Sequence, residues 1–339
     1  MDLRDYIIRR LLLLIPVLFG ITLLIFAVLM LFSPSQRAAV YATSPKALKN
    51  IDVIIQKYGL NEPIYVQYFT WLKQVLSGNL GFSQIASRPV LEAILDKLPA
   101  TFELALFSAP LILIPGFYLG TVAATHKDKL VDQFSRVLAI VGWSLPTFWL
   151  GLILLMFFSG ILPTGRLSNQ AVLLKQSEAF TVYTGMNTVD ALLNGKFWMF
   201  FDAVQHLILP AVTLAVVSMA ALMRIMRSSM LEELRAKYVT TARAKGLKEE
   251  TVINKHARRN ALISPVTTAT WMVALLFNGV AVVEIIFNYK GIGWLFIRSA
   301  QQLDIATVLG FSLFNGLIIM LFNLLADILY AYLDPRINY

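Results

Sequence analysis

Long stretches of uninterrupted apolar residues alternate with short charged stretches along this chain. The charge-free runs cover six ranges: 11–32, 104–125, 137–165, 207–223, 260–283 and 305–326. A helix needs about 20 apolar residues to cross the hydrocarbon core of a membrane. Five of the runs meet that length directly, and the shorter run 207–223 reaches it if His206 and Arg224 extend to the two interfaces. The pattern therefore predicts an all-α integral membrane protein with six transmembrane helices.

The composition supports this prediction. Hydrophobic residues make up 58% of the 339 positions and charged residues only 14%, whereas a soluble domain has about 45–50% and about 25%. A net charge of +9 suggests nucleic acid in a soluble protein, but in a membrane protein it is typical of cytoplasmic loops, so we expect lipid and no nucleic acid as a partner. The absence of Cys excludes disulfides, thiolate metal sites and cysteine nucleophiles.

The distribution of Lys and Arg predicts the orientation. With both termini in the cytoplasm, the inner segments hold 17 Lys/Arg in 64 residues and the outer segments 12 in 128. Inner loops are enriched in positive charge in membrane proteins. We therefore expect a multi-pass protein of the cell (inner or plasma) membrane with both termini cytoplasmic.

The first 32 residues invite a second interpretation, because Arg9 and Arg10 precede an apolar run and AVYA (39–42) resembles a cleavage site for a signal peptide. A signal peptide has an apolar core of about 7–15 residues. The run here extends from 11 to 32, so residues 1–32 are predicted to be a cytoplasmic N-terminus and a retained first span.

The segment 33–99 is predicted to be an outer loop with short amphipathic helices. Ser44 and Pro45 are a helix-start signal, and Gly59 is a helix-stop signal. A second amphipathic stretch covers 63–78, and its aromatic residues form either an interfacial belt or a docking face for a partner: Tyr65, Tyr68, Phe69 and Trp71. Residues 100–339 are predicted to form a five-span transmembrane core with a cytoplasmic loop at 224–259, and the loop 161–205 has no informative pattern.

Sequence motifs for enzymatic chemistry are absent. There is no G-x-x-x-x-G-K-[ST] phosphate loop, no G-x-S-x-G nucleophile elbow and no H-E-x-x-H motif. Three acidic residues flank the apolar runs: Glu103, Glu284 and Asp327. Each is either an interfacial residue paired with a neighbouring helix or part of a proton relay, so an ion- or proton-driven secondary transporter is the alternative function.

The basic segment 238–262 combines six Lys/Arg with a central glycine. Its composition predicts a helix over 238–245 with Gly246 as left-handed C-cap and Leu247 as the apolar residue that closes the cap, followed by a second helix from Glu249 to about Arg259. Ala242 and Gly246 share one side of the first helix, which would let a partner surface approach closely. Binding of anionic lipid headgroups is the alternative interpretation.

This segment, read as YVTTARAKGL followed by VINKHARRNALISPVTT, resembles the EAA loop of membrane permease subunits from binding-protein-dependent ABC importers. The resemblance covers most of the chain and is greatest for the first permease subunit of the dipeptide/oligopeptide/nickel group. Further matching stretches are SLPTFWLG (144–151), HLILPAVTLA (206–215), VVEIIF (282–287), GIGWL (291–295) and NLLADILYAYLDPRI (323–337). The chain departs from the family pattern at SPSQ (33–36), Asn79, Lys290 and Ser264–Pro265.

The resemblance implies a type I ABC importer permease fold and a mechanism of transport. This chain and a second homologous permease subunit would form the pathway for peptides, nickel or oligosaccharides. Two ATP-binding subunits would bind the ATP, so this chain would need no cofactor, and an extracytoplasmic substrate-binding protein would deliver the substrate. The coupling helix that contacts an ATPase would comprise 238–246, with these ATPase-coupling residues: Tyr238, Thr241, Ala242, Arg243, Ala244, Lys245, Gly246 and Leu247.

Overall fold

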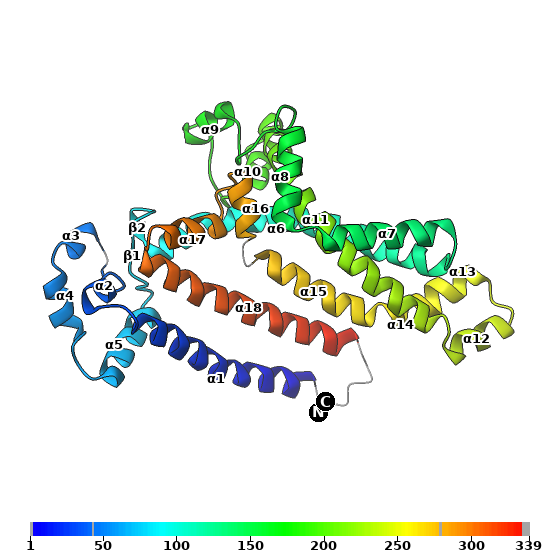
Figure 1. Ribbon diagram of the computed structural model, residues 1–339, viewed down its shortest axis with the longest axis horizontal. Helices are drawn as coiled ribbons and strands as arrows, with labels where there is room; N and C mark the ends of the chain where they lie inside the picture. The colour runs from blue at the N-terminus through cyan, green and yellow to red at the C-terminus, as the bar shows by residue number, and fades with distance from the viewer. Residues whose placement is uncertain (1–2, 43, 278–279, 334–339) are drawn as a thin grey trace.

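The computed structural model describes residues 3–42, 44–277 and 280–333, most of which lie in helices. The four longest helices follow the long axis of the molecule (Figure 1): α1 (Leu3–Leu29), α6 (Val90–Thr125), α11 (Phe197–Glu233) and α18 (Ile305–Leu333). All four are long and apolar enough to cross a membrane. Prolines inside α1, α6 and α11 do not end these helices, as is common in membranes, where neighbouring helices satisfy the freed backbone groups.

The third predicted span is broken into two helices. Helices α7 (Leu130–Ser144) and α8 (Thr147–Phe158) meet at an angle of 99°. Leu145 adopts an extended conformation before Pro146, because proline disfavours helical conformation in the residue that precedes it and lacks an N–H for the helix ladder. The run 137–165 is therefore not one straight helix, and the break coincides with its proline.

The fifth predicted span is also bent. The helical stretch 249–261 meets α15 (Ile263–Phe277) at 53°. Residues 278–279, within the predicted run 260–283, lie outside the described part of the chain. The short helix α16 (Ala281–Ile286) follows them and contains the last three residues of the run. Counting each bent pair as one span, the described residues hold up to six candidate spans, the predicted number.

A group of short helices occupies one end of the molecule, at the left of Figure 1. It comprises α2 (Pro34–Ala38), α3 (Pro45–Leu48), α4 (Ile51–Tyr58) and α5 (Ile64–Leu76). The predicted start and stop signals are confirmed, since the Ser44 side chain accepts a hydrogen bond from the backbone of Ala47 and Gly59 has a left-handed φ of 63°. The sequence predicted one helix between Ser44 and Gly59. The structure has two, α3 and α4, because the helix is interrupted at Lys49 and Asn50.

The aromatic residues of α5 do not share one face. Tyr68 and Trp71 are buried, and the Trp71 ring lies 5.6 Å from the ring of Phe26 at the end of α1. Tyr65 and Phe69 are exposed on the opposite side. The predicted four-residue belt or docking face is therefore wrong for Tyr68 and Trp71, because the apolar side of α5 packs against α1.

A short antiparallel strand pair connects this end to the long helices. Strands β1 (Phe82–Ser83) and β2 (Arg88–Pro89) pair Phe82 with Pro89, and α6 begins directly after β2. The predicted boundary at residue 100 consequently lies inside α6.

Helices α6 and α11 pack together closely through glycines. A Cβ atom added to Gly120 would lie 2.6 Å from the Cβ of Met226, and one added to Gly116 would lie 2.8 Å from Leu222 Cδ2. Small residues permit such close approach of helices in membranes, where van der Waals packing replaces the hydrophobic effect as the driving force. The α6–α11 pair forms the centre of the molecule.

The segment 161–205, for which the sequence gives no informative pattern, contains two helices and the start of α11. Helices α9 (Asn169–Gln176) and α10 (Asn187–Leu193) enclose a small core of their own, made of Ala171, Phe180, Ala191 and Met199. Near them lie α16 and α17 (Ile292–Gln301), as Figure 1 shows. At the far end of the molecule from α2–α5, α11 leads into α12 (Lys237–Ala244).

Candidate coupling site

Helix α12 ends in the predicted glycine cap. Gly246 has a left-handed φ of 74°, its N–H donates to the carbonyl of Arg243 at 2.9 Å, and the N–H of Leu247 donates to the carbonyl of Ala242 at 3.4 Å. These two bonds form a Schellman motif, which satisfies carbonyls that the helix end would leave unpaired. Within the described part of the chain, no atom lies within 4 Å of a Cβ built on Gly246. The position therefore requires glycine for its backbone conformation and not for lack of space.

One side of α12 is packed against the chain itself. Val239 and Ala242 are buried in a cluster with Met226 and Met230 of α11 and with Val252. The predicted small-residue face formed by Ala242 and Gly246 is therefore wrong for Ala242, whose side chain contacts this chain's own core. Because Val239 and Ala242 are three positions apart, they form the buried stripe of an amphipathic helix.

The other predicted coupling residues lie on the solvent side of α12 and its cap. They are Tyr238, Thr241, Arg243, Ala244, Lys245, Gly246 and Leu247. Seven of the eight predicted residues are thus exposed on α12 and its cap. We call these seven residues the α12 outer surface.

Two polar side chains of this surface have partners within the chain. Arg243 binds the carboxylate of Glu249 through Nη2 at 2.6 Å and Nε at 3.1 Å, and the Tyr238 hydroxyl donates to the carboxylate of Glu233. The Arg243–Glu249 pair is solvent-exposed, so its contribution to stability is small. It joins the two helices across the Gly246 turn, and pairing of Arg243 with an acidic partner protein would have to compete with it.

The second predicted helix forms, but with an irregular middle. It begins as α13 (Glu249–Thr251), continues as the π-helix Val252–Ala257 and returns to α-helix as α14 (Arg258–Ala261). Val252 and Ala257 are buried in the cluster under α12. The wider π-helical turn was not predicted from the sequence.

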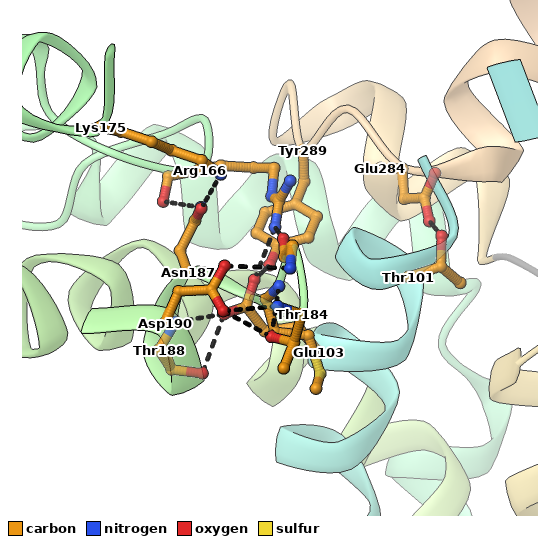
Figure 2. Close-up of polar contacts among 12 residues, drawn as sticks. Thr101, Glu103, Arg166, Lys175, Thr184, Asn187, Thr188, Asp190, Glu284 and Tyr289 are labelled. Atoms are coloured by element: carbon orange, nitrogen blue, oxygen red, sulfur yellow. Dashed lines mark hydrogen bonds and ion pairs between the residues drawn. The ribbon is translucent and has the colours of Figure 1, made fainter. Parts of the chain in front are cut away.

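A second polar group lies in the other half of the molecule, around Glu103 of α6 (Figure 2). The buried carboxylate of Glu103 accepts hydrogen bonds from the N–H and hydroxyl of Thr188, at 2.7 and 2.9 Å, and from the Tyr289 hydroxyl at 2.8 Å. Arg166 approaches the same carboxylate at 2.9 Å and also donates to the carbonyl of Gly185 at 3.1 Å. These contacts fasten the segment 161–205 to α6, and we call the four residues Glu103, Arg166, Thr188 and Tyr289 the Glu103 cluster.

Neighbouring side chains extend this network through the α9–α10 region. Lys175 donates to the side-chain oxygen of Asn187 at 2.6 Å, and Asp190 accepts from the backbone and hydroxyl of Thr184 at 2.8 Å (Figure 2). Burial lowers the pKa of the Lys175 ammonium group. The loop between α8 and α11 is thus an ordered unit held by charged and polar side chains.

Glu284 has a separate set of partners. Its buried carboxylate accepts from the Thr101 hydroxyl at 2.6 Å and from the N–H of Trp294 at 2.8 Å, while Thr101 accepts from the N–H of Ile292 at 3.0 Å. Side chains from α6 and α16 therefore cap the N-terminus of α17, whose own N-cap, Gly291, has no side chain to do so. A Cβ on Gly291 would overlap Glu284 Oε1, which explains the glycine at the start of GIGWL.

The two described acidic residues of the predicted set are thus paired within the chain. Glu103 and Glu284 contact neighbouring elements, as the interfacial interpretation predicts, although both are buried. The side chain of Asp327 lies outside the described part of the chain. The partners of Glu103 were not predicted from the sequence, because Arg166, Thr188 and Tyr289 lie 63 to 186 positions away from it in the chain.

Comparison with known families gives the context of these features. The model of the family described as "Binding-protein-dependent transport system inner membrane component" matches residues 116–339, and that of its N-terminal segment matches residues 3–105. The chain belongs to this family. The predicted resemblance and the predicted helical membrane fold are confirmed, and membership implies that an ATPase and a substrate-binding protein act with this inner membrane permease.

Relatives match over nearly the full length of the chain. The oligopeptide transport system permease protein AppB of Bacillus subtilis is 38% identical over 338 residues, covering 98% of this chain and 99% of the relative. The dipeptide transport system permease protein DppB of Escherichia coli is 36% identical over 343 residues, covering 99% of each. The probable D,D-dipeptide transport system permease protein DdpB of Escherichia coli is 39% identical over 292 residues, covering 85% and 84%.

Proposed function

We propose that this chain is the permease of an ATP-driven peptide importer and that the α12 outer surface is its contact with the ATPase. The proposal on the substrate is supported by the relatives, whose names specify dipeptides, oligopeptides and D,D-dipeptides. The proposal on the contact is supported by one observation above all: α12 is attached to the core by Val239 and Ala242 and exposes its other side. When a partner protein displaces a helix with this arrangement, the displacement can be transmitted to α11.

The proposed assembly contains other proteins besides this chain. A second, homologous permease completes the pathway, two ATPase subunits bind the ATP, and an extracytoplasmic binding protein delivers the peptide. Both termini and α12 lie in the cytoplasm, which agrees with the excess of Lys and Arg in the segments assigned there. No cofactor is required in this chain, because the free energy of transport comes from ATP in the ATPase subunits.

The test replaces one exposed alanine in the α12 outer surface. Ala244→Asp introduces a negative charge and a larger side chain without disturbing the buried stripe, since Ala244 is exposed. In the complete complex, reconstituted in proteoliposomes with ATP, we expect loss of peptide uptake and weaker retention of the ATPase subunits during purification. Ala179→Asp is the matched control, because Ala179 is also exposed but lies in the loop after α9; it should transport normally.

Two results would contradict the proposal. Normal uptake by the Ala244→Asp complex would show that the α12 outer surface is not the contact with the ATPase. Uptake driven by a proton gradient in liposomes that contain this chain alone, without ATP, would show a secondary transporter. Competition for uptake by unlabelled dipeptides, longer peptides or nickel identifies the substrate class.

A further inference from the structure

An ion pair between a buried carboxylate and a partly exposed arginine joins α7 to the end of α11 that leads into α12. Asp132 of α7 has no exposed surface, and its carboxylate accepts bonds from Arg227 of α11 at both oxygens: Nε to Oδ1 at 2.6 Å and Nη2 to Oδ2 at 2.8 Å. The backbone N–H of Asp128 adds a bond to Oδ2 at 3.0 Å. Bidentate arginine–carboxylate pairs fix the relative orientation of their partners as well as their distance. The pair therefore holds α7 and α11 in one arrangement at this point.

The position of Arg227 on α11 links this pair to α12. Its neighbours Met226 and Met230 are fully buried in the cluster that contains Val239 and Ala242 of α12. Arg227 thus lies in the same two turns of α11 whose methionines share a buried cluster with α12. Any displacement of α12 that moves this end of α11 also moves Arg227.

The other end of α7 leads to a cavity between the helices. After the bend at Leu145–Pro146, Thr147 at the start of α8 lines a cavity of about 450 Å³. Ser218 of α11 lines the same cavity, together with residues of α15 and α16 such as Met272 and Val283. None of the described side chains that line it is charged. One part of the cavity wall therefore belongs to α11, which shares a buried cluster with α12. Another part belongs to α8, which is connected to α11 through α7.

We propose that Asp132 and Arg227 are positioning residues for transport: their ion pair makes α7, and with it Thr147 on α8, follow α11 when the ATPase moves α12. This inference rests on the proposed role of α12. The packing of Gly142 against Ala220 keeps α7 and α11 in contact further along, but apolar contacts without directional bonds allow sliding. The ion pair at the α12 end supplies the directional bonds that prevent it.

The absence of cysteine from this chain makes the movement of single positions measurable. Thr147→Cys and Ser218→Cys each place one thiol in the same cavity, on α8 and on α11. Their rates of reaction with a small maleimide are compared with and without ATP in the complete reconstituted complex, with cysteine-free partner subunits. In the chain with the intact ion pair we expect ATP to alter both rates.

The ion pair is then broken by Asp132→Asn. We expect the ATP-dependent change at position 147 to disappear and that at position 218 to remain, while peptide uptake per ATP hydrolysed falls about tenfold, within the range typical of coupling between distant sites. Arg136 also lies 3.9 Å from Asp132 Oδ2, so the charge-exchanged variant combines Asp132→Arg and Arg227→Asp with Arg136→Gln. It should restore part of the ATP-dependent change at position 147 and part of the uptake. If Asp132→Asn prevents assembly, Arg227→Lys replaces it, since lysine keeps the charge but cannot make the bidentate contact.

The outcomes separate this inference from the function on which it rests. If ATP still changes the reaction rate at position 147 as strongly in Asp132→Asn and Arg227→Lys as with the intact pair, the ion pair does not carry the movement and the inference is wrong. If ATP changes neither position in the chain with the intact pair, the proposed coupling through α12 is wrong. The variants could also unfold at a lower temperature while ATP still changes the reaction rates at both positions. That result would show that the ion pair only stabilises the protein, and it would also overturn the inference.

Discussion

The hydroxyl of Thr101 donates a 2.6 Å hydrogen bond to Oε1 of Glu284, joining α6 to α16 across 183 positions of the chain. The same hydroxyl oxygen accepts a bond from the N–H of Ile292. We predict that Thr101→Val destabilises the protein by about 1–3 kcal/mol, because Glu284 Oε1 and the N–H of Ile292 lose the bonds that Thr101 provides. The measurement is thermal unfolding in detergent. Thr268→Val is the control, since the hydroxyl of Thr268 bonds to the carbonyl of Ser264 within its own helix; an equal loss in both variants would contradict the prediction.

Gly291→Ala tests the close contact at the start of α17. The added Cβ would overlap Glu284 Oε1 and Thr101 Oγ1. We expect destabilisation of about 1–3 kcal/mol, the usual cost of overpacking, because both atoms it meets are held by other bonds. Gly160→Ala, with no described atom within 4 Å of the new Cβ, should unfold at the temperature of the wild type. Unchanged unfolding of Gly291→Ala would mean that the α16–α17 contact is looser than described.

Arg166→Met removes the cation of the Glu103 cluster. Breaking a buried ion pair by deleting one partner costs about 3 kcal/mol, because the remaining charge stays buried without compensation. We expect faster amide hydrogen exchange in the segment 184–193, which the cluster attaches to α6. In the control Arg88→Met, the lost partner is Asp96 in an exposed pair at 3.9 Å, so stability should change by less than about 1 kcal/mol. Unaltered exchange in Arg166→Met would show that the other bonds suffice to hold the segment.

Gly246→Ala tests the backbone conformation at the end of α12. A non-glycine residue at a φ of 74° is strained by about 1–2 kcal/mol, and asparagine tolerates this region better than alanine. Peptide uptake by the complete complex should therefore decrease in the order glycine, asparagine, alanine. Because no described atom contacts a Cβ here, a steric explanation would predict no difference between glycine and alanine.

Tyr41 is expected to make stability depend on alkaline pH. Burial raises the pKa of its hydroxyl from 10.0 to about 12, against the opposing charge of Arg37. The unfolded chain loses this proton at a lower pH than the folded chain, so the stabilisation is present below pH 10 and is lost as the pH rises toward 12. We expect the stability of the wild type relative to Tyr41→Phe to fall by on the order of 2 kcal/mol across this range. Exposed Tyr65, changed to Phe, is the control and should give a curve parallel to that of the wild type.

Features that depend on residues close together in the chain were mostly predicted correctly, and features that depend on residues far apart in the chain were not. The apolar runs and the Gly246 cap are local, and the structure has helices or bent helix pairs at the runs and a Schellman motif at the cap. The bend at Pro146 has a local cause too, since proline acts on the residue that precedes it. The burial of Ala242 was misjudged because the side of α12 that faces the core depends on Met226 and Met230. The partners of Glu103 could not be inferred from local patterns, because they come from α10 and from the segments before α9 and α17.

The glycine contacts between α6 and α11 determine which parts of the molecule can change shape. Gly116 and Gly120 bring the backbone of α6 against Leu222 and Met226. Since α6 and α11 also share the most extensive interface among the described helices, we expect them to move as one rigid body. The third span is different, since Leu145 is extended before Pro146 and its φ and ψ angles are free of the helix ladder. The bend at Leu262 keeps its helical bonds to Arg258 and Val266. A cycle of opening and closing would therefore keep the geometry of the central helix pair. The first residue of α8 would follow α7, and the remainder of α8 could rotate about the break at Leu145–Pro146.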